Sequence, residues 1–477
     1  MTSQPSSIKF KVEPIIPSAA RTSASLRDIG YDTPRAIADL VDNSVAANAS
    51  HVAVDFHFEG TRSRIRVTDN GTGMDAATLL DAMRYGSERE YSADDLGKFG
   101  FGLKTASTSQ CTRVTVASRR APNNAHIEVR CLDLGHIEDT NRWEVLVLEG
   151  SDRPDSVIEP LLDHTGTVVL WENLDRILEY KDPWGDWAKK KLMALAEQVD
   201  NHLGMVFHRF LAGEVPDRRL TIAVNGARVQ PWDPFSRGET KTEELPFKGF
   251  AIHGDSGTGI VRVQPYVLPR QNEFSSDAAW RRSSGPASWN RQQGFYVYRA
   301  YRMIQSGGWN RMRTLDEHTK LARISIDFFP DLDSVFGINI TKAQVNLPQE
   351  LRELLQPVIA QVTRRADDRY RTKDPKGLRA GTPHEGASQE PASPRADPSS
   401  ASTPPTSTGH SHIGGARPNG PYGSSSASSE WQPATPAVKP RQAIEDAAAK
   451  IGEETALERI ITSLMEQHPE VARALGW

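Results

Sequence analysis

Apolar and polar residues alternate along the first part of the chain with two different periods. From Thr33-Pro34, where Thr33 can cap a helix and Pro34 suits its first position, apolar residues recur at helical spacing: Ile37, Leu40, Val41 and Val45. Residues 51–60 and 62–71 instead alternate apolar with polar residues, which predicts a hairpin of two half-buried strands. A further apolar strand is expected within residues 164–174.

Mixed helix and strand patterns continue to about residue 370. Apolar residues at helical spacing occupy positions 192–210, and Asn225-Gly226 predicts the turn of a hairpin. We expect four more strands, at 248–254, 259–268, 293–305 and 321–329. A long helix should begin near Pro348. The pattern as a whole is typical of an α+β protein.

The composition changes after this region. Nearly half of residues 373–440 are Pro, Gly or Ser and few are large and apolar, so we expect a disordered linker over 371–440. Residues 441–477 regain a helical pattern but are too few to enclose a core alone. We expect these short helices to dock on a protein partner or to self-associate.

Charge and cysteine content limit the classes of protein. The 477 residues carry a net charge of −4, so any nucleic-acid contact must come from a local patch. Cys111 and Cys131 make neither a disulfide framework nor a zinc site and fit a reducing compartment. The N-terminus lacks the apolar core of a signal peptide, and no apolar run is long enough to span a membrane. We therefore expect a cytoplasmic protein with no membrane partner.

Two polar motifs accompany the first predicted helix and hairpin. Asp39 and Asn43 lie four residues apart on one helix face, where carboxylate and carboxamide oxygens can hold Mg²⁺ and its waters. The second strand ends in "DNGTGM" at 69–74, whose glycines permit a sharp turn close to a ligand. Asp69 could accept a hydrogen bond from an exocyclic amine such as that of adenine. Taken alone, the first motif also fits a solvated helix face, and the second fits an ordinary turn.

A third motif, "LGKFGFGLKTAS" at 96–107, combines glycines with lysines. Gly97, Gly100 and Gly102 precede a helix-like stretch, and backbone N–H groups at such a helix start bind anions. Lys98 and Lys104 add charges suited to phosphate. The motif is not a P-loop, because GxxxxGK[ST] is absent, and no predicted strand runs directly into it, which disfavours a Rossmann site.

Together, in this order and spacing, the motifs resemble the ATP site of the GHKL superfamily, which includes gyrase, chaperone, histidine-kinase and MutL-type ATPases. The amino-acid sequence of these motifs is most similar to that of the MORC branch and its bacterial relatives, and the resemblance covers residues 20–175. The resemblance implies a GHKL (Bergerat) α/β sandwich at 20–178, after an N-terminal arm at 1–19. It also implies an S5-like α+β transducer domain at 179–370.

The resemblance further implies ATP and Mg²⁺ as cofactors, with Asn43 as the metal ligand. The residues implied to surround adenine are Asp69, Gly71, Gly73, Met74 and Thr167. Those implied to hold the phosphates are Gly97, Lys98, Gly100, Gly102, Leu103, Lys104 and Thr105, with residues 84–103 as a mobile lid.

The general base departs from the family's pattern. Relatives usually carry Glu at the position of Asp39, and the shorter Asp should align an attacking water less well. Asp42 is a weaker substitute because it points to another part of the helix. We therefore expect an ATPase that turns over slowly and works mainly as an ATP-gated switch.

A lysine from the second domain completes the implied catalytic set. The family typically sends a transducer lysine to the γ-phosphate, and Lys342 in "NITKAQVNLP" fits that position, with Gln344 as a helper. The same sequence also fits a solvent-exposed lysine in a loop.

Residues 270–313 form a basic patch, with eight arginines against Glu273 and Asp277, a local net charge of +6. Aromatic residues are interleaved with these arginines, as in surfaces that contact phosphates and stack on bases, with Arg281, Arg282 and Arg291 as candidate DNA contacts. The alternation also fits a strand with one solvated face and several core aromatics.

Two functions remain open from the sequence. The first is an ATP-dependent homodimeric clamp acting on DNA, in a restriction or phage-defence context by resemblance. The second is a chaperone-like ATPase that remodels protein clients without binding DNA. A histidine kinase is disfavoured because no His-bearing dimerisation helix precedes the ATP motifs. A MutL-type nuclease is disfavoured because the tail holds no metal-ligand cluster, and a topoisomerase would need a partner.

Overall fold

The computed structural model describes residues 15–28, 31–85, 102–120, 126–179, 182–254, 257–286, 288–337 and 345–372, and a few helical residues between 457 and 465. Contacts divide the chain into one unit of residues 1–382 and another of residues 383–477. The expected linker, from residue 373 onward, and most of the C-terminal segment lie outside the described residues. The first unit holds two hydrophobic cores, each built on its own sheet.

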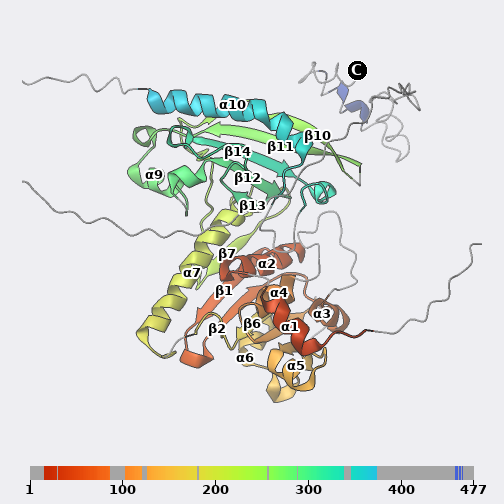
Figure 1. Ribbon diagram of the computed structural model, residues 1–477. Coiled ribbons are helices and arrows are strands. Elements are labelled where there is room, and N and C mark those ends of the chain that lie inside the picture. Colours follow the sequence, from red (N-terminus) through yellow and green to blue (C-terminus); the bar gives the residue numbers. More distant parts are fainter. Residues whose placement is uncertain are drawn as a thin grey trace, which may run out of the picture. The chain divides into compact units, whose positions relative to one another are not determined.

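The first core rests on an eight-stranded sheet with the order β5-β4-β3-β6-β2-β1-β7-β8. Figure 1 labels β1, β2, β6 and β7 of this sheet. Neighbouring strands pair antiparallel, except that β1 and β7 run parallel. The strands are β1 (His51–His57), β2 (Arg64–Asp69), β3 (Arg113–Arg119), β4 (Glu128–Asp133), β5 (Leu146–Val147), β6 (Gly166–Glu172), β7 (Thr221–Val224) and β8 (Ala227–Arg228). The predicted hairpin at 51–71 is therefore confirmed as β1 and β2.

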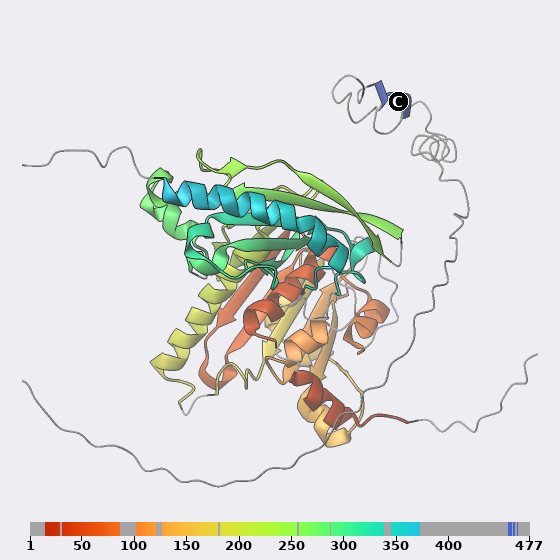
Figure 2. The same ribbon diagram turned by 45° about the horizontal axis from the view of Figure 1, so that its top comes forward.

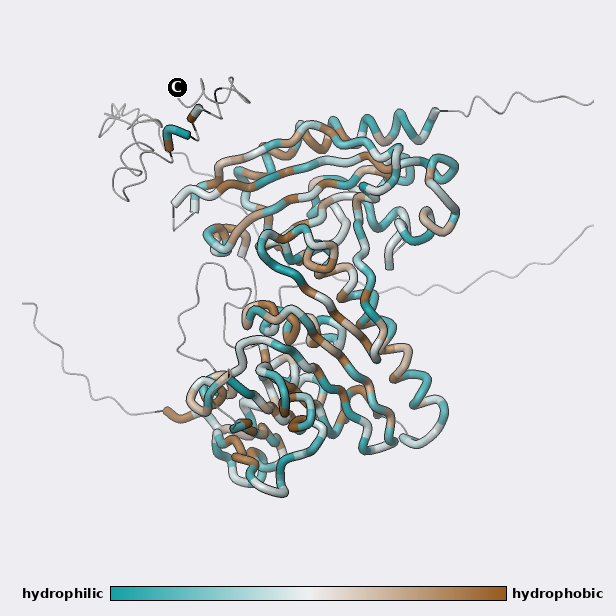
Figure 3. The backbone as a smooth tube through the Cα atoms, turned by 180° about the vertical axis from the view of Figure 1, so that it is seen from behind, coloured by the Kyte–Doolittle hydropathy of each residue, from teal (hydrophilic) through white to brown (hydrophobic). Residues whose placement is uncertain are grey.

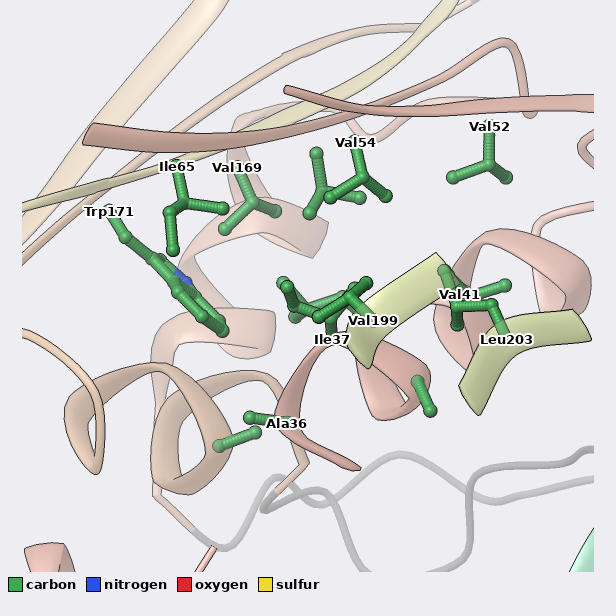
Figure 4. Close-up of a cluster of buried hydrophobic side chains, with 14 of the residues drawn as sticks. Ala36, Ile37, Val41, Val52, Val54, Ile65, Val169, Trp171, Val199 and Leu203 are labelled. Atoms are coloured by element: carbon green, nitrogen blue, oxygen red, sulfur yellow. The ribbon is translucent and has the colours of Figure 1, made fainter. Parts of the chain in front are cut away.

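Helices cover this sheet on both faces. The helices of the domain are α1 (Ala19–Arg27), α2 (Thr33–Ala46), α3 (Ala76–Met83), α4 (Gly102–Thr108), α5 (Leu134–Thr140), α6 (Asp155–Ile158), α7 (Asp186–Val206) and α8 (His208–Leu211). Figure 4 shows side chains of α2 and α7 facing side chains of the strands across the main core. Strand β6 serves both faces, because Val169 and Trp171 join this core while Val168 and Leu170 join a smaller cluster beside α6.

The start of α2 differs in detail from the sequence prediction. Asp32, not Thr33, is the capping residue, and its carboxylate accepts a hydrogen bond from the Arg35 N–H at 2.9 Å. Thr33 is instead the first helical residue, and its hydroxyl donates to Gln110 at 2.6 Å. Asp and Thr both cap helices well, so the pattern alone left the boundary uncertain by one residue.

The first core extends past the domain boundary expected at residue 178. Helix α7 packs on α2, and β7 adds a parallel strand to the outer side of β1, from Val52 paired with Ile222 to Val54 paired with Val224. The apolar core accordingly continues to Val229. Parallel pairing over this sequence distance leaves no local signature, which explains why the sequence placed these elements in the second domain.

The second core rests on a six-stranded sheet with the order β10-β11-β14-β12-β13, in which β9 also pairs with β11. Its strands are β9 (Glu243–Glu244), β10 (Lys248–Gly254), β11 (Gly257–Val267), β12 (Gly294–Arg299), β13 (Arg302–Ser306) and β14 (Ala322–Phe328). Helix α10 (Gln349–Arg371) lies across β10, β11 and β14, as Figures 1 and 2 show. In Figure 3, apolar residues recur along α10 before its hydrophilic end. Helix α9 (Asp277–Ser283) lies to one side of this sheet, as Figure 1 shows.

The stretch expected as one strand at 293–305 is a hairpin of β12 and β13. Ala300 and Tyr301 form its turn, with φ values of 46° and 69°. Every residue of β12 is buried, because the strand lies between β14 and β13 and is covered on both faces. The interpretation of this segment as a strand with one solvated face is therefore wrong.

The hairpin and α8 connect the two cores. Ala300 and Tyr301 pack against the first core, and His208 on α8 shares a hydrogen bond of 2.9 Å with the Tyr298 hydroxyl on β12. Arg209 beside it forms a partly buried ion pair with Asp327 on β14. Among the described residues, no helix is long and apolar enough to cross a membrane.

Candidate active site

Helix α2 presents its two predicted site residues in different environments. Asn43 is exposed, so its carboxamide is open to a ligand. Asp39 is 4% exposed, and its Oδ2 accepts a hydrogen bond of 2.8 Å from the Tyr31 hydroxyl. Burial, and then the Asp39 charge, raise the pKa of Tyr31 above its usual range, so this hydroxyl remains a donor.

Asp69 at the end of β2 is held by three hydrogen bonds. Its Oδ1 accepts from the backbone N–H of Gly71 at 2.9 Å and of Thr167 at 3.3 Å, and its Oδ2 accepts from the Ser44 hydroxyl at 2.9 Å. Burial raises the pKa of Asp69 even though these bonds act in the opposite direction. Ser44 follows Asn43 on α2, so the predicted metal ligand and the predicted adenine contact lie on adjoining elements.

The turn after β2 needs its glycines. Gly73 has a φ of +63°, and a Cβ there would lie 2.0 Å from the carbonyl oxygen of Arg119. The neighbouring Met74 N–H donates to the Ser118 hydroxyl at 2.8 Å, and that hydroxyl also lies 2.9 Å from the Thr167 hydroxyl. The structure thus brings together all five residues predicted to surround adenine, and it ties Met74 to Thr167 through Ser118.

The predicted phosphate-binding residues are described only from Gly102 onward. Gly102 and the half-buried Leu103 begin α4, and a Cβ on Gly102 would meet no described atom within 4 Å. The Thr105 hydroxyl is buried and has no hydrogen-bond partner among the described residues. Gly97, Lys98 and Gly100, most of the expected lid, and Lys342 with Gln344 lie outside the described residues.

Lys104 lies deeper in the fold than a surface phosphate ligand would. The residue is 2% exposed, and its ammonium group donates to the carbonyl oxygen of Ala82 at 3.0 Å and to that of Arg84. Burial lowers the pKa of Lys104 to about 8. In this structure the lysine therefore binds the C-terminal end of α3, directly before the expected lid.

A buried charge cluster joins α2 to the second core. The Nε of Arg302, the first residue of β13, donates to Asp42 at 3.2 Å, and its Nη2 lies 3.8 Å from Asp39 Oδ1. The side chains of Arg302, Asp39 and Asp42 are 8%, 5% and 1% exposed. The expectation that Asp42 points to a separate part of the helix is therefore wrong, since one guanidinium contacts both carboxylates.

The basic patch at 270–313 separates into surface and core. Arg281, Arg282 and Arg291 are exposed, as candidate DNA contacts must be, although Arg282 also donates to the Pro231 carbonyl oxygen at 2.9 Å. Arg299 and Arg302 are buried in ion pairs. Most of the aromatic residues belong to the second core, and these are Phe295, Tyr296, Tyr298 and Trp309. The outer part retains Trp280 stacked on Trp289, with ring centroids 3.7 Å apart.

Residues 31–161 match the family model of histidine kinase-, DNA gyrase B- and HSP90-like ATPases. The first core contains a GHKL ATPase domain. This assignment agrees with the geometry, because the matched stretch carries α2, the turn after β2 and α4. The resemblance to the GHKL superfamily and the expected mixed α+β fold are thereby confirmed.

The chain is also similar to DNA mismatch repair proteins named MutL. That of Shewanella baltica is 24% identical over 296 residues, which is 59% of this chain and 42% of the relative. That of Opitutus terrae is 34% identical over 113 residues, or 22% of this chain and 18% of the relative. That of Allorhizobium ampelinum is 33% identical over 94 residues, which is 19% of this chain and 15% of the relative. The matched parts span less than half the length of each relative.

The residues of the GHKL domain fit a nucleotide. The enclosed Asp69 carboxylate, held beside Gly71 and Gly73, suits the amine of a purine, and the buried Thr105 hydroxyl is a donor for an oxygen-rich ligand. The exposed Asn43 supplies an oxygen of the type that Mg²⁺ binds. No group of three or more His, Cys, Asp or Glu side chains forms a metal site within the described part of the chain.

Sequence reasoning missed four polar residues at this site. Ser44 and Ser118 are common residue types inside ordinary elements, and Tyr31 precedes the helix that it contacts. Arg302 was assigned to the basic patch, and only the hairpin geometry brings it to α2. For Arg302, a usable signal was its position directly after a turn in an otherwise apolar strand.

Proposed function

We propose that this protein is an ATP-gated switch that acts on DNA. ATP binding would close the lid and bring two N-terminal domains together as a clamp, and slow hydrolysis would release them. The observation that carries the proposal is the Asp69 carboxylate, which three hydrogen bonds fix between α2 and β6 inside a domain matched to GHKL ATPases. ATP need only bind the closed form more tightly than the open form to shift the population.

Each site residue has a role in this proposal. Asp69, Gly71, Gly73, Met74 and Thr167 would hold adenine. Asn43 would hold Mg²⁺, which supplies positive charge next to the phosphates when it is bound. Asp39 would take a proton from the attacking water. Lys342, from an S5-like transducer domain, would contact the γ-phosphate.

The action on DNA rests on two observations. Arg281, Arg282 and Arg291 are exposed and lie close in sequence to Trp280 and Trp289, which stack on each other and pack partly buried against the second core. The relatives described above are named as DNA mismatch repair proteins, although each match covers only part of their length. A MORC-like clamp is the form of this function that the sequence motifs favour, and the resemblance to bacterial relatives suggests a restriction or phage-defence context.

Nucleotide binding and hydrolysis test the first half of the proposal. Isothermal titration calorimetry of the full chain with Mg²⁺ and a non-hydrolysable ATP analogue should show binding that Asn43→Ala weakens strongly. Phosphate release should be slow in wild type and absent in Asp39→Asn, because an amide cannot accept the proton. Undiminished affinity in Asn43→Ala, or undiminished release in Asp39→Asn, would contradict these roles.

DNA binding tests the second half. Changing Arg281, Arg282 and Arg291 together to Gln should weaken DNA binding and reduce its salt dependence. The matched control changes the exposed Lys189, Lys190 and Lys191 of α7 to Gln, which removes the same charge from the other core. Equal losses in both triple variants would indicate attraction by overall charge rather than by this patch.

A chaperone-like ATPase is the second candidate. It is favoured by the burial of most aromatic residues of the patch, since core side chains cannot stack on bases. DNA binding that is absent in wild type, together with intact ATP hydrolysis, would select this function.

A further inference from the structure

Arg302 belongs to the second core but reaches into the first. It begins β13 immediately after the Ala300-Tyr301 turn, and that turn packs on the first core. Its guanidinium donates from Nε to Asp42 at 3.2 Å and from Nη1 to the backbone carbonyl of Met303 at 3.2 Å. Its Nη2 lies 3.8 Å from Asp39 Oδ1. The Arg302 side chain thus contacts Asp39 and Asp42 on α2 and the backbone of Met303 on β13.

The Asp39 carboxylate is held from two sides. Tyr31 donates to its Oδ2, and Arg302 faces its Oδ1. A guanidinium is planar and presents its donors in fixed directions, so it restricts the orientation of a carboxylate more than a single ammonium would. A general base must be held close to a productive geometry, because a displacement of about 1 Å can lower a rate by about 100-fold.

The hairpin that carries Arg302 is itself anchored in the second core. Arg299, at the end of β12, binds both carboxylate oxygens of Asp333 at 2.7 and 2.8 Å, and both side chains are buried. The Ala300-Tyr301 turn therefore lies between Arg299, which is fixed in the second core, and Arg302, which contacts α2. A movement of the second core relative to the first would displace the Arg302 guanidinium from α2.

We propose that Arg302 is a positioning residue for ATP hydrolysis, which orients Asp39 from the second core so that turnover depends on the seating of the β12–β13 hairpin. The inference rests on the proposed role of Asp39 as the base. It also means that Arg302 acts at the ATP site and is not among the basic residues that could contact DNA.

The test compares Arg302→Met and Arg302→Lys in the full chain. We expect Arg302→Met to lower kcat by about 10- to 100-fold, the range that misplacement of a reacting group produces. The affinity for a non-hydrolysable ATP analogue should change by less than about threefold, because within the described part of the chain no hydrogen bond or ion pair joins Arg302 to the predicted adenine residues. Arg302→Lys keeps the charge without the planar fork and should restore part of kcat.

Arg209→Met is the matched control for the junction between the cores. Arg209 also forms an ion pair across that junction, a partly buried one with Asp327, but no contact of Arg209 with Asp39 is found among the described residues. We expect this variant to unfold at a lower temperature with kcat within about threefold of wild type. An equal fall of kcat in both variants would overturn the specific role of Arg302.

The Asp39→Asn background separates the two claims. If both proposals hold, Asp39→Asn abolishes hydrolysis, and adding Arg302→Met lowers it no further. If Asp39→Asn is inactive but Arg302→Met keeps or raises kcat, the role of Arg302 in positioning Asp39 is overturned, while the role of Asp39 as the general base stands. If Asp39→Asn hydrolyses normally, both are overturned. Should Arg302→Met fail to fold, Arg302→Met with Asp42→Asn removes one of the facing carboxylates and must still show the low kcat.

Discussion

At the scale of single residues, burial sets the properties of Asp69. Its raised pKa means that the folded state disfavours the ionised carboxylate. Its contribution to the free energy of unfolding is therefore largest below the ordinary carboxyl pKa and is lost as pH rises through the raised value. The ionised carboxylate that the proposal needs as an acceptor for the adenine amine is therefore held at a cost in the free energy of unfolding.

Asp69→Asn should therefore separate stability from function. We expect the free energy of unfolding in urea to be equal to wild type or higher at neutral pH, and this advantage to shrink as the solution is made mildly acidic. Affinity for an ATP analogue should fall by about 10-fold or more, because the amide presents a donor to the adenine amine. A less stable variant with unchanged nucleotide affinity would contradict the assigned role.

The lowered pKa of Lys104 predicts that the affinity for an ATP analogue depends on pH in the alkaline range. Because the pKa of Lys104 is lowered to about 8, the ammonium that donates to the Ala82 and Arg84 carbonyl oxygens loses its charge as pH rises past that value, and the end of α3 beside the candidate nucleotide site should then be held less firmly. One pH unit above the pKa corresponds to about a tenfold loss of the charged form, so analogue affinity should fall by a similar factor. In Lys104→Met we expect weaker affinity at neutral pH and a flat profile above it. The same alkaline decline in the variant would assign the titration to another group.

The length of the side chain at position 39 should limit the rate. Asp39→Glu adds the methylene group that the family's usual base carries, and we expect a higher kcat than in wild type. Phosphate release under saturating ATP measures it. A variant that hydrolyses no faster would show that Asp is not what makes turnover slow.

Most residues that the structure brings together at the candidate site could be predicted from the sequence, because Asp69, the two turn glycines and Thr167 carry motif signals; their contact with adenine stays a prediction. Tyr31 and Arg302 could not, since each acts through a contact that only the tertiary fold creates. Lys104 was identified, but its burial against the end of α3 was not readable from the motif.

At the scale of elements, the turn between β2 and α3 fixes the site by close backbone approach. Gly73→Ala would combine a left-handed backbone with a Cβ 2.0 Å from the Arg119 carbonyl oxygen. Gly150 has a similar φ of +54° but open space around its Cβ position, so Gly150→Ala is the matched control. We expect the control to cost about 1 kcal/mol of unfolding free energy with normal nucleotide binding. Gly73→Ala should cost more and weaken binding, as denaturation and calorimetry would show. Equal costs would mean that the turn is free to move.

The sequence predicted the type of most elements but not how they are covered. The strands at 51–71 and the helix after Pro348 were found from their periods. The β12–β13 hairpin was read as one strand, because Ala300-Tyr301 is an unusual pair for a turn with positive φ. Burial of β12 on both faces depends on partners distant in the chain, so alternation could not reveal it.

At the scale of the whole molecule, the two cores meet where ion pairs and hydrogen bonds stand beside apolar contacts of Met205, Ala300 and Tyr301. The GHKL domain was identified from short motifs, whereas the extension of the first hydrophobic core to Val229 depends on the parallel pairing of β1 with β7. Through Arg302 and the His208–Tyr298 contact, the second core touches the helix and the segments that carry the site. This arrangement suits a protein in which nucleotide state and domain position are coupled.

Light scattering tests the central claim most directly. The mass of the full chain would be measured without nucleotide, with ADP, and with Mg²⁺ and a non-hydrolysable ATP analogue, for wild type and Asn43→Ala. We predict a dimer only with the analogue, and no dimer in the variant under the same condition. A mass that is the same in all three nucleotide states of the wild-type protein would contradict an ATP-gated clamp.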